Sequence, residues 1–149
     1  MRLLLDENVP RPLHQVLTAF MLTHEIVHLL DLPGWSGTRD EALYPRARAE
    51  GFHVVLTNDG RQMHRAREVA AIAASGLHRV EYPHRHPGLV GIGVAIATGA
   101  AGLPGALAVL EEEEGQRLVT LRGVDPTVGS RLRVVDPAVQ PPKFWPSWS

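Results

Sequence analysis

Short apolar runs alternate with amphipathic stretches along most of the chain. Residues 3–5 are three leucines followed at once by two acids, which is typical of a strand buried on both faces and ending at a polar edge. From Leu13 to Phe20 the apolar residues recur at helical spacing. The same alternation predicts further strands over 26–30, 53–57 and 77–82, and further helices over 40–50 and 61–75.

This order predicts an α/β fold, a three-layer domain in which helices cover both faces of a mostly parallel central sheet. The apolar stretch over 89–110 is expected to form one or two buried helices with a kink near Gly102 and Pro104. We do not expect a membrane span there, because glycines interrupt the stretch and no charged or aromatic residues anchor its ends. Two edge strands are expected over 117–121 and 131–135.

We expect a single domain over residues 1–139, followed by a tail over residues 140–149. The tail is rich in proline and contains the aromatic residues Phe144, Trp145 and Trp148. Large apolar side chains at this density predict that the tail packs on its own domain or on a partner. A chain of 149 residues can bury a sufficient core without help from disulfides or a structural metal.

The amino-acid composition excludes several kinds of site and reaction. The chain has no cysteine, which excludes disulfides, thiolate metal sites and cysteine nucleophiles. Its 15 basic residues nearly balance 16 acidic ones, so binding to nucleic acid would need a local basic patch rather than net charge. The apolar run at the start is too short for a signal peptide, and we therefore expect a cytoplasmic protein with no membrane partner.

Two other nucleotide- or phosphate-related folds do not fit the sequence. A phospho-acceptor receiver domain also carries acids after its strands, but it needs a lysine near the fifth strand, whereas the only lysine here is Lys143. A dinucleotide-binding domain needs three glycines between a strand and a helix, and the pair Gly91 and Gly93 lacks both the third glycine and that context.

Acidic and polar side chains follow the predicted strands, at the edge where ligands of parallel sheets collect. Asp6 ends the first strand, Asp59 follows the strand over 53–57, and Asp40 begins a helix. If the two strands are neighbours, Asp6 and Asp59 come within reach of one hard cation. Oxygen ligands without cysteine or a well-placed histidine favour Mg²⁺ or Mn²⁺, and such an ion supports phosphodiester hydrolysis. Helix caps and a turn would explain the same three aspartates, and spacing alone leaves both interpretations open.

Four segments in the first half of the chain form an ordered pattern of motifs: Leu-Leu-Leu-Asp-Glu-Asn-Val-Pro at 3–10, Asp-Glu-Ala-Leu at 40–43, Ala-Glu-Gly at 49–51 and Val-Leu-Thr-Asn-Asp at 55–59. In these segments the chain resembles the PIN-like nuclease superfamily. The most similar branch contains small bacterial proteins that begin with a Leu-Leu-Asp-Glu-Asn strand and are often associated with toxin-antitoxin pairs. The resemblance implies a metal-dependent ribonuclease that hydrolyses RNA phosphodiester bonds and acts as the toxin of such a pair.

The resemblance also implies roles for individual residues. The catalytic and metal-binding residues would be Asp6, Asp40 and Asp59, which would hold Mg²⁺ or Mn²⁺. The supporting residues would be Glu7, Asn8, Glu41, Thr57 and Asn58. Asn8 would orient Asp6 or the substrate, and Thr57 would hydrogen-bond a site carboxylate. The implied partners are RNA and a cognate antitoxin protein, while a homodimer stays open.

The sequence departs from the family pattern at two places. Related sequences usually have a further acid two residues after the position of Asp59, and this chain has Arg61 there. Pro45 also lies inside the helix that carries Asp40, which leaves open where that carboxylate points. The missing acid favours the alternative, a catalytically inactive PIN-like domain that serves as a protein-interaction module, whereas the three retained aspartates favour the enzyme.

Basic residues follow the third predicted strand closely. Arg61 and Arg65 are expected to share one face of the helix over 61–75 and to contact the phosphates of RNA, although charged residues on such a helix commonly just face solvent. His84 and His86 lie in a proline-rich loop and lack a third ligand nearby, so a histidine metal site there is a minor alternative.

Overall fold

The computed structural model describes residues 1–146 and contains one central sheet. The strands are β1 (Arg2–Leu5), β2 (Glu25–His28), β3 (Val54–Thr57), β4 (His78–Glu81) and β5 (Leu118–Thr120). The α-helices are α1 (Arg11–Phe20), α2 (Asp40–Ala49), α3 (Ala66–Ser75), α4 (Gly88–Glu111) and α5 (Val128–Arg131), and two 3₁₀ segments are η1 (Leu29–Asp31) and η2 (Gly60–His64). The sheet order is β2-β1-β3-β4-β5 and every neighbouring pair is parallel.

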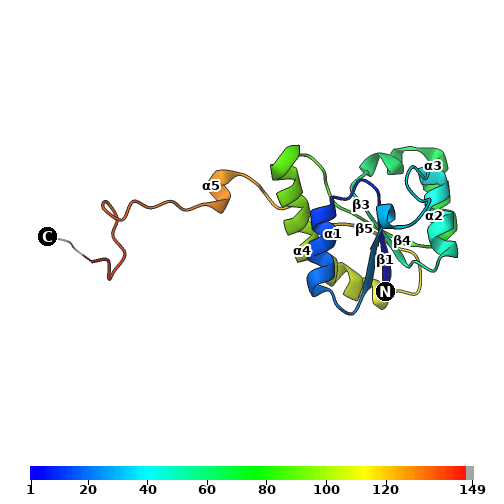
Figure 1. Ribbon diagram of the computed structural model, residues 1–149, viewed down its shortest axis with the longest axis horizontal. Helices are drawn as coiled ribbons and strands as arrows, with labels where there is room; N and C mark the ends of the chain where they lie inside the picture. The colour runs from blue at the N-terminus through cyan, green and yellow to red at the C-terminus, as the bar shows by residue number, and fades with distance from the viewer. Residues whose placement is uncertain (147–149) are drawn as a thin grey trace.

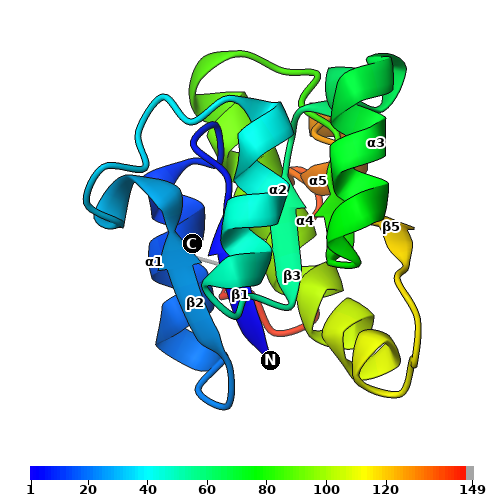
Figure 2. The ribbon, with the colours of Figure 1, turned by 90° about the vertical axis from the view of Figure 1, so that its right-hand side faces the viewer.

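The sheet forms the middle layer of three, as the sequence predicts. Helices α1 and α4 lie on one face of the sheet, and α2 and α3 lie on the other (Figures 1 and 2). A hydrophobic core lies on each face of the sheet, and alternate side chains of β1 pack into one or the other. Leu3 and Leu5 pack with α1 and α4, whereas Leu4 packs with α2 and α3. This burial on both faces explains why β1 is continuously apolar.

The apolar stretch near residue 100 forms one continuous helix, α4, with Pro104 inside it. One side of α4 packs against α1 and the sheet through residues such as Leu103 and Leu107. The other side stays apolar and exposed, with Leu89 and Val109 in the open. By length and composition α4 would also suffice to cross a membrane, and 28% of its most apolar window is buried. The expectation of a buried helix therefore holds for only one side of α4.

The predicted helix over 61–75 is divided in two. Its first part is the 3₁₀ segment η2, and Arg65 lies in extended conformation between η2 and α3. Arg61 and Arg65 therefore do not share one helix face, which corrects the prediction from spacing. In contrast, the helix expected over 40–50 is present as α2, which begins at Asp40 and has Pro45 within it on the exposed side.

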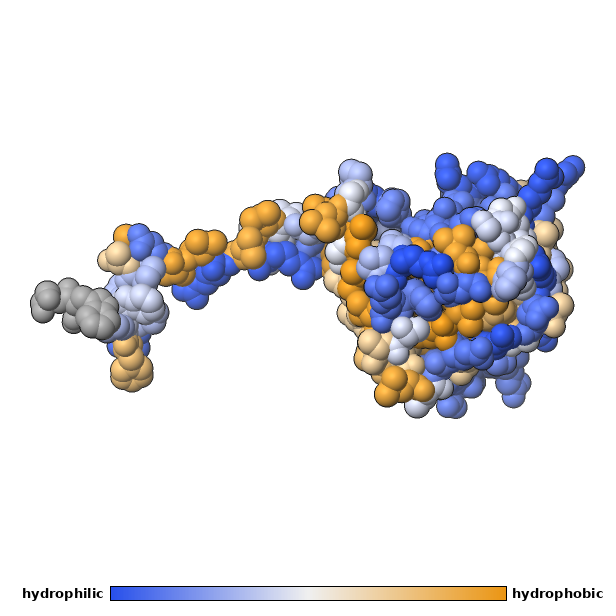
Figure 3. All heavy atoms as spheres, in the orientation of Figure 1, coloured by the Kyte–Doolittle hydropathy of each residue, from blue (hydrophilic) through white to orange (hydrophobic). Residues whose placement is uncertain are grey.

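The part of the chain after β5 differs most from expectation. The edge strand expected over 131–135 is wrong, because this region contains only the short α5 and extended chain without strand pairing among the described residues. Residues from 127 to 146 run away from the domain and are almost all exposed (Figures 1 and 3). Phe144 is 88% exposed, so the tail does not pack on its own domain here. Trp148 lies outside the described residues.

Candidate active site

Two of the predicted acids lie at the same edge of the sheet because β1 and β3 are neighbours. Leu5 pairs with Leu56 in register, so Asp6 directly after β1 lies beside the end of β3. Asp59 follows β3 by two residues, and the amide of Asp6 donates a hydrogen bond to the carbonyl of Leu56. The structure therefore confirms that these two strands are neighbours, whereas a cation shared by Asp6 and Asp59 stays a prediction.

Asp6 is buried, with 4% of its surface exposed, and it is held by three donors. The Thr57 hydroxyl donates to its Oδ2 at 2.8 Å, and the Glu7 amide donates to its Oδ1 at 2.7 Å. The Gln62 amide nitrogen lies 3.4 Å from Oδ2. Burial raises the pKa of Asp6 above its ordinary value, and these hydrogen bonds oppose that effect. The expected contact from Thr57 to a site carboxylate is thus present.

Gln62 connects Asp6 to the third acid. Its Nε2 also donates to Oδ1 of Asp40 at 3.1 Å, so one amide group bridges two carboxylates. Its Oε1 accepts from the guanidinium of Arg79 at 3.4 Å and from the Tyr44 hydroxyl at 3.3 Å. Because a guanidinium can only donate, Oε1 must face Arg79, and this orientation fixes Nε2 toward the acids.

Arg79 is a buried cation beneath the acid cluster, with 2% of its surface exposed. It forms an ion pair with Glu81 at 2.6 Å and donates to the carbonyl of Asp59 at 2.9 Å. A buried charge is tolerated when it is paired and hydrogen-bonded, as Arg79 is. Sequence reasoning missed Gln62 and Arg79. The available signal was a charged residue inside β4, since strands of a parallel sheet covered on both faces are otherwise apolar.

Asp40 lies in the first turn of α2 and is half-buried. Burial raises its pKa, and the neighbouring carboxylates of Asp6, Glu68 and Asp59 raise it further. Arg65 lies between Asp40 and Glu68, with its Nη1 3.8 Å from Asp40 and 2.8 Å from Glu68. The other oxygen of Glu68 is buried and has no hydrogen-bond partner within residues 1–146. Glu68 is a further acid that the sequence reasoning did not identify.

Asp59 faces solvent more than Asp6 does. Its Oδ1 accepts from the backbone amide of Arg61 at 3.0 Å and from the Arg61 side chain at 3.3 Å. Its own amide donates to the Thr57 hydroxyl at 3.1 Å, so Thr57 connects Asp59 to Asp6. Arg61 therefore forms an ion pair with the carboxylate of Asp59, although 80% of the Arg61 side chain is exposed.

The remaining supporting residues have different positions. Glu7 turns to the loop after η1, where it accepts from the Ser36 hydroxyl at 3.0 Å. Asn58 donates to the backbone carbonyl of Asn8 at 3.1 Å. No hydrogen bond from the Asn8 side chain to Asp6 is formed, so of its two expected roles only substrate contact remains. Glu41 is exposed in the first turn of α2.

The donor set fits a hard cation, although it is not arranged as a finished metal site. Within residues 1–146 no group of three or more His, Asp or Glu side chains has converged closely enough to hold an ion. Asp6 and Asp40 are instead connected by Gln62, and Asp59 is paired with Arg61. Asp59 raises the pKa of Asp6, and Asp6 and Asp59 raise the pKa of Asp40, because their negative charges lie close together. A divalent ion with oxygen ligands would offset this repulsion.

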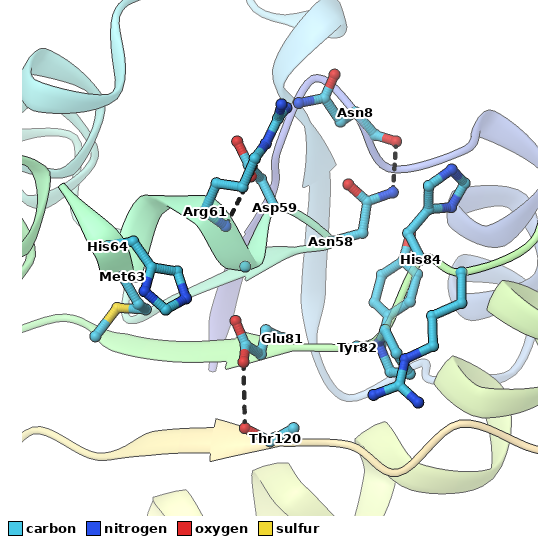
Figure 4. A pocket seen from close by; sticks show the side chains of 13 residues that line it. Asn8, Asn58, Asp59, Arg61, Met63, His64, Glu81, Tyr82, His84 and Thr120 are labelled. Atoms are coloured by element: carbon cyan, nitrogen blue, oxygen red, sulfur yellow. Dashed lines mark hydrogen bonds and ion pairs between the residues drawn. The ribbon is translucent and has the colours of Figure 1, made fainter.

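A cavity of about 770 Å³ opens beside Asp59, at the carboxyl ends of β3 and β4. Figure 4 shows Met63 and His64 of η2 on one side of it and His84 on the other, with Asn58 and Asp59 between them. Ligands of open parallel sheets bind at this end of the strands. Asp59 therefore lines a space large enough for a substrate, whereas Asp6 and Asp40 are not among the residues that line it.

Comparison with known protein families gives one finding. The model of the family described as PIN like domain matches residues 1–81, which is more than half of the chain and includes β1 to β4 with all three aspartates. No significant match was found among curated proteins or among solved structures.

Proposed function

Because the chain belongs to the family of PIN-like domains, and this family points to the PIN-like nuclease superfamily, we propose that this protein is a metal-dependent ribonuclease. Its cofactor would be Mg²⁺ or Mn²⁺, and its reaction would be hydrolysis of RNA phosphodiester bonds. The observation that carries the proposal is the position of Asp6. It is a buried carboxylate with a raised pKa, connected through Gln62 to Asp40 and through Thr57 to Asp59, and Asp59 lines an open cavity.

The residues that would hold the ion are Asp6, Asp40 and Asp59. When bound, the ion would supply an oriented water and neutralise charge that develops on the phosphate. Thr57 fixes Asp6 and receives the amide of Asp59, which keeps these two side chains at the edge of the sheet. For Asp40 to turn toward an ion, the amide of Gln62 must release it.

The positive charges have different tasks in this proposal. Arg79 is buried and already paired with Glu81. Its positive charge therefore offsets the negative charge of the nearby carboxylates, and its side chain does not contact substrate. Arg61 is exposed and its contact with Asp59 is to a partly exposed carboxylate, so it can exchange Asp59 for a phosphate. Arg65 is held between two acids, and its task is to position Asp40 rather than to bind RNA.

Calorimetric titration with Mn²⁺ tests the proposal. The unmodified protein should bind Mn²⁺ saturably, and Asp6→Asn and Asp59→Asn should each lose that binding. Asp125→Asn, which changes an exposed acid far along the chain, is the matched control and should bind normally. Cleavage of single-stranded RNA should require Mn²⁺ and be lost in Asp6→Asn. No binding by the unmodified protein, or equal binding by all variants, would contradict the proposal.

A second candidate function is a protein-interaction module without nuclease activity. The observation that favours it is the exposed apolar tail, in which Val134 and Phe144 are 90% and 88% exposed. Such side chains are typical of a segment that is covered by a partner. In the toxin interpretation this partner would be a cognate antitoxin in the cytoplasm. The Mn²⁺ titration distinguishes the two functions, because an interaction module needs no ion at Asp6.

A further inference from the structure

One long side of helix α4 has no partner within the described part of the domain. Leu89 in the first turn of α4 is 85% exposed, and Val90 and Val109 are exposed as well. The tail leaves the domain beside α4 and then runs away from it, so this side stays apolar at the surface (Figures 1 and 3). Exposed apolar surface that continues along a whole helix is typical of an interface.

The exposed side of α4 is built on residues at every fourth position. We call this row the α4 face, and it consists of Leu89, Gly93, Ala97, Ala101, Gly105 and Val109, all exposed except the partly buried Ala97. Residues four apart form a ridge on a helix, and such ridges pack into the grooves of a second helix. The small residues in the middle of the row let a second helix approach closely.

Two glycines of the α4 face have no explanation inside the domain. Gly99, which is not on the face, needs to be small, because a side chain there would overlap Leu13. In contrast, a Cβ at Gly93 or at Gly105 would have no atom within 4 Å. A glycine inside a helix costs about 1 kcal/mol relative to alanine, so a glycine at an open position needs a reason outside the domain. Close approach of another backbone is such a reason.

The α4 face has the same spacing in both directions from its centre. Three pairs of its residues lie at equal intervals before and after Gly99: Ala97 and Ala101, Gly93 and Gly105, and Leu89 and Val109. A surface with this symmetry matches a second copy of itself that is related by a two-fold axis. The α4 face therefore fits another molecule of this chain, with the two helices antiparallel.

The charges at the ends of α4 favour the same arrangement. Arg85 lies just before the helix, whereas Glu112 and Glu114 follow it. All three are exposed and form no ion pair within residues 1–146. An antiparallel pair brings the basic end of one helix toward the acidic end of the other, whereas a parallel pair brings like charges together. A lipid surface fits less well, because helices that lie on membranes carry large apolar residues and a basic polar face.

We propose that two copies of this chain associate through the α4 face, with their α4 helices antiparallel. The proposal goes beyond the nuclease function and does not depend on it. Near the two-fold axis Ala97 meets Ala101 of the partner subunit, and further out Gly93 meets Gly105 of the partner subunit. Because each copy contributes one helix with small residues at its centre, we expect a dissociation constant of about 1–100 μM.

Sedimentation velocity of the full chain between about 1 and 300 μM tests the association. The unmodified protein should convert from monomer to dimer over this range. Ala101→Gln places a long polar side chain at the centre of the α4 face and should weaken the dimer at least about tenfold. Ala73→Gln is the matched control, since Ala73 is an exposed alanine of α3, on the other side of the sheet (Figure 2). It should change the dissociation constant less than about twofold.

Gly105→Gln separates association from folding. The added side chain meets no atom of the domain at its Cβ and replaces glycine by a better helix former. The melting temperature at about 1 μM, where the monomer prevails, should therefore rise, while the variant should stay monomeric at the highest concentration. A lowered melting temperature together with an unchanged dimer would show that Gly105 serves the fold, and it would overturn the inference.

Cross-linking tests the orientation of the two helices. The chain has no cysteine, so each introduced cysteine is unique. On oxidation, a mixture of Gly93→Cys and Gly105→Cys should form disulfide-linked dimers, whereas neither variant alone should do so. Linked dimers of Gly93→Cys alone would indicate parallel helices and overturn the inference.

Two further outcomes would contradict the proposal. A chain that is monomeric at every concentration would overturn it, as would equal dissociation constants for Ala101→Gln and Ala73→Gln. Sedimentation with vesicles of phosphatidylcholine and phosphatidylglycerol is the second arm. Binding of a monomeric chain to these vesicles, lost in Ala101→Gln, would assign the α4 face to a lipid surface instead of a second copy.

Discussion

The hydroxyl of Thr57 donates a hydrogen bond of 2.8 Å to Oδ2 of Asp6, across 51 positions of the sequence. The contact exists because β1 and β3 are parallel neighbours, so the residues at their ends meet at one edge. The same hydroxyl accepts from the amide of Asp59 at 3.1 Å. One buried threonine thus sets the relative position of two acids that follow separate strands.

Thr57→Val is therefore expected to destabilise the protein by about 1–3 kcal/mol, because it keeps the shape but removes one of the three donors of a buried carboxylate and the acceptor of the Asp59 amide. Thr57→Ser keeps the hydroxyl and should retain most of the stability. Urea unfolding of the three proteins at neutral pH measures the difference. Equal stability of the Val and Ser variants would show that the hydroxyl carries no weight in the fold.

Arg79 provides the next prediction, which concerns the buried charge below the site. Arg79→Met should cost about 3 kcal/mol or more, since it leaves Glu81 unpaired and removes donors from Gln62 and from the carbonyl of Asp59. Adding Glu81→Gln removes the unpaired charge and should recover part of the loss. The measurement is again urea unfolding of the single and double variants. If the double variant is less stable than Arg79→Met alone, the ion pair is not the main role of Arg79.

The sequence predicted the framework of the site and missed its interior. The carboxyl-terminal positions of Asp6 and Asp59 could be predicted, because strand ends and parallel order follow from the apolar pattern. Gln62 could not, because its importance depends on the 3₁₀ turn of η2, which replaces the start of the helix expected from residue 61. The role of Glu68 could not be predicted either, because a glutamate on a short helix is ordinarily exposed, whereas here it is buried beside Arg65.

His28 makes the stability sensitive to acid. It is fully buried, with Nε2 2.8 Å from the carbonyl of Val9, while its Nδ1 accepts from the amide of Leu30 at 3.2 Å. The imidazole is therefore neutral with its proton on Nε2, and burial lowers the pKa of His28 below 6.5. The charged groups around it are Arg11, His14 and Asp31, of which Asp31 opposes the shift.

Because the folded state prefers neutral His28, its stabilising effect is complete above pH 6.5 and is lost as the pH falls through the lower folded-state pKa. The free energy of unfolding should therefore decline on acidification below that pH by up to about 1.4 kcal/mol per pH unit from this group. His28→Gln should show a shallower decline in urea unfolding, and the exposed His64→Gln should not. Parallel pH profiles for all three proteins would contradict this role.

The tail supplies the last prediction, on whether residues beyond the domain contribute to folding. Residues 127–146 are nearly all exposed, whereas Leu121 is buried at the end of β5 and the amide of Val124 donates to the Thr98 hydroxyl at 3.2 Å. A truncation after Pro126 should consequently leave the melting temperature unchanged within about 2 °C. It should also raise solubility, because it removes exposed apolar side chains such as Phe144.

A truncation after Gly115 is the matched comparison, because it also removes β5, which pairs with β4 at the edge of the sheet. It should unfold the protein or lower the melting temperature strongly, since Leu121 packs beneath Gly102 of α4. Differential scanning calorimetry of both truncations, with size-exclusion chromatography to record their oligomeric state, separates the two regions. A large loss of stability after removal of residues 127–149 alone would mean that the tail packs on the domain in solution, which is one of the two possibilities that its aromatic composition predicts.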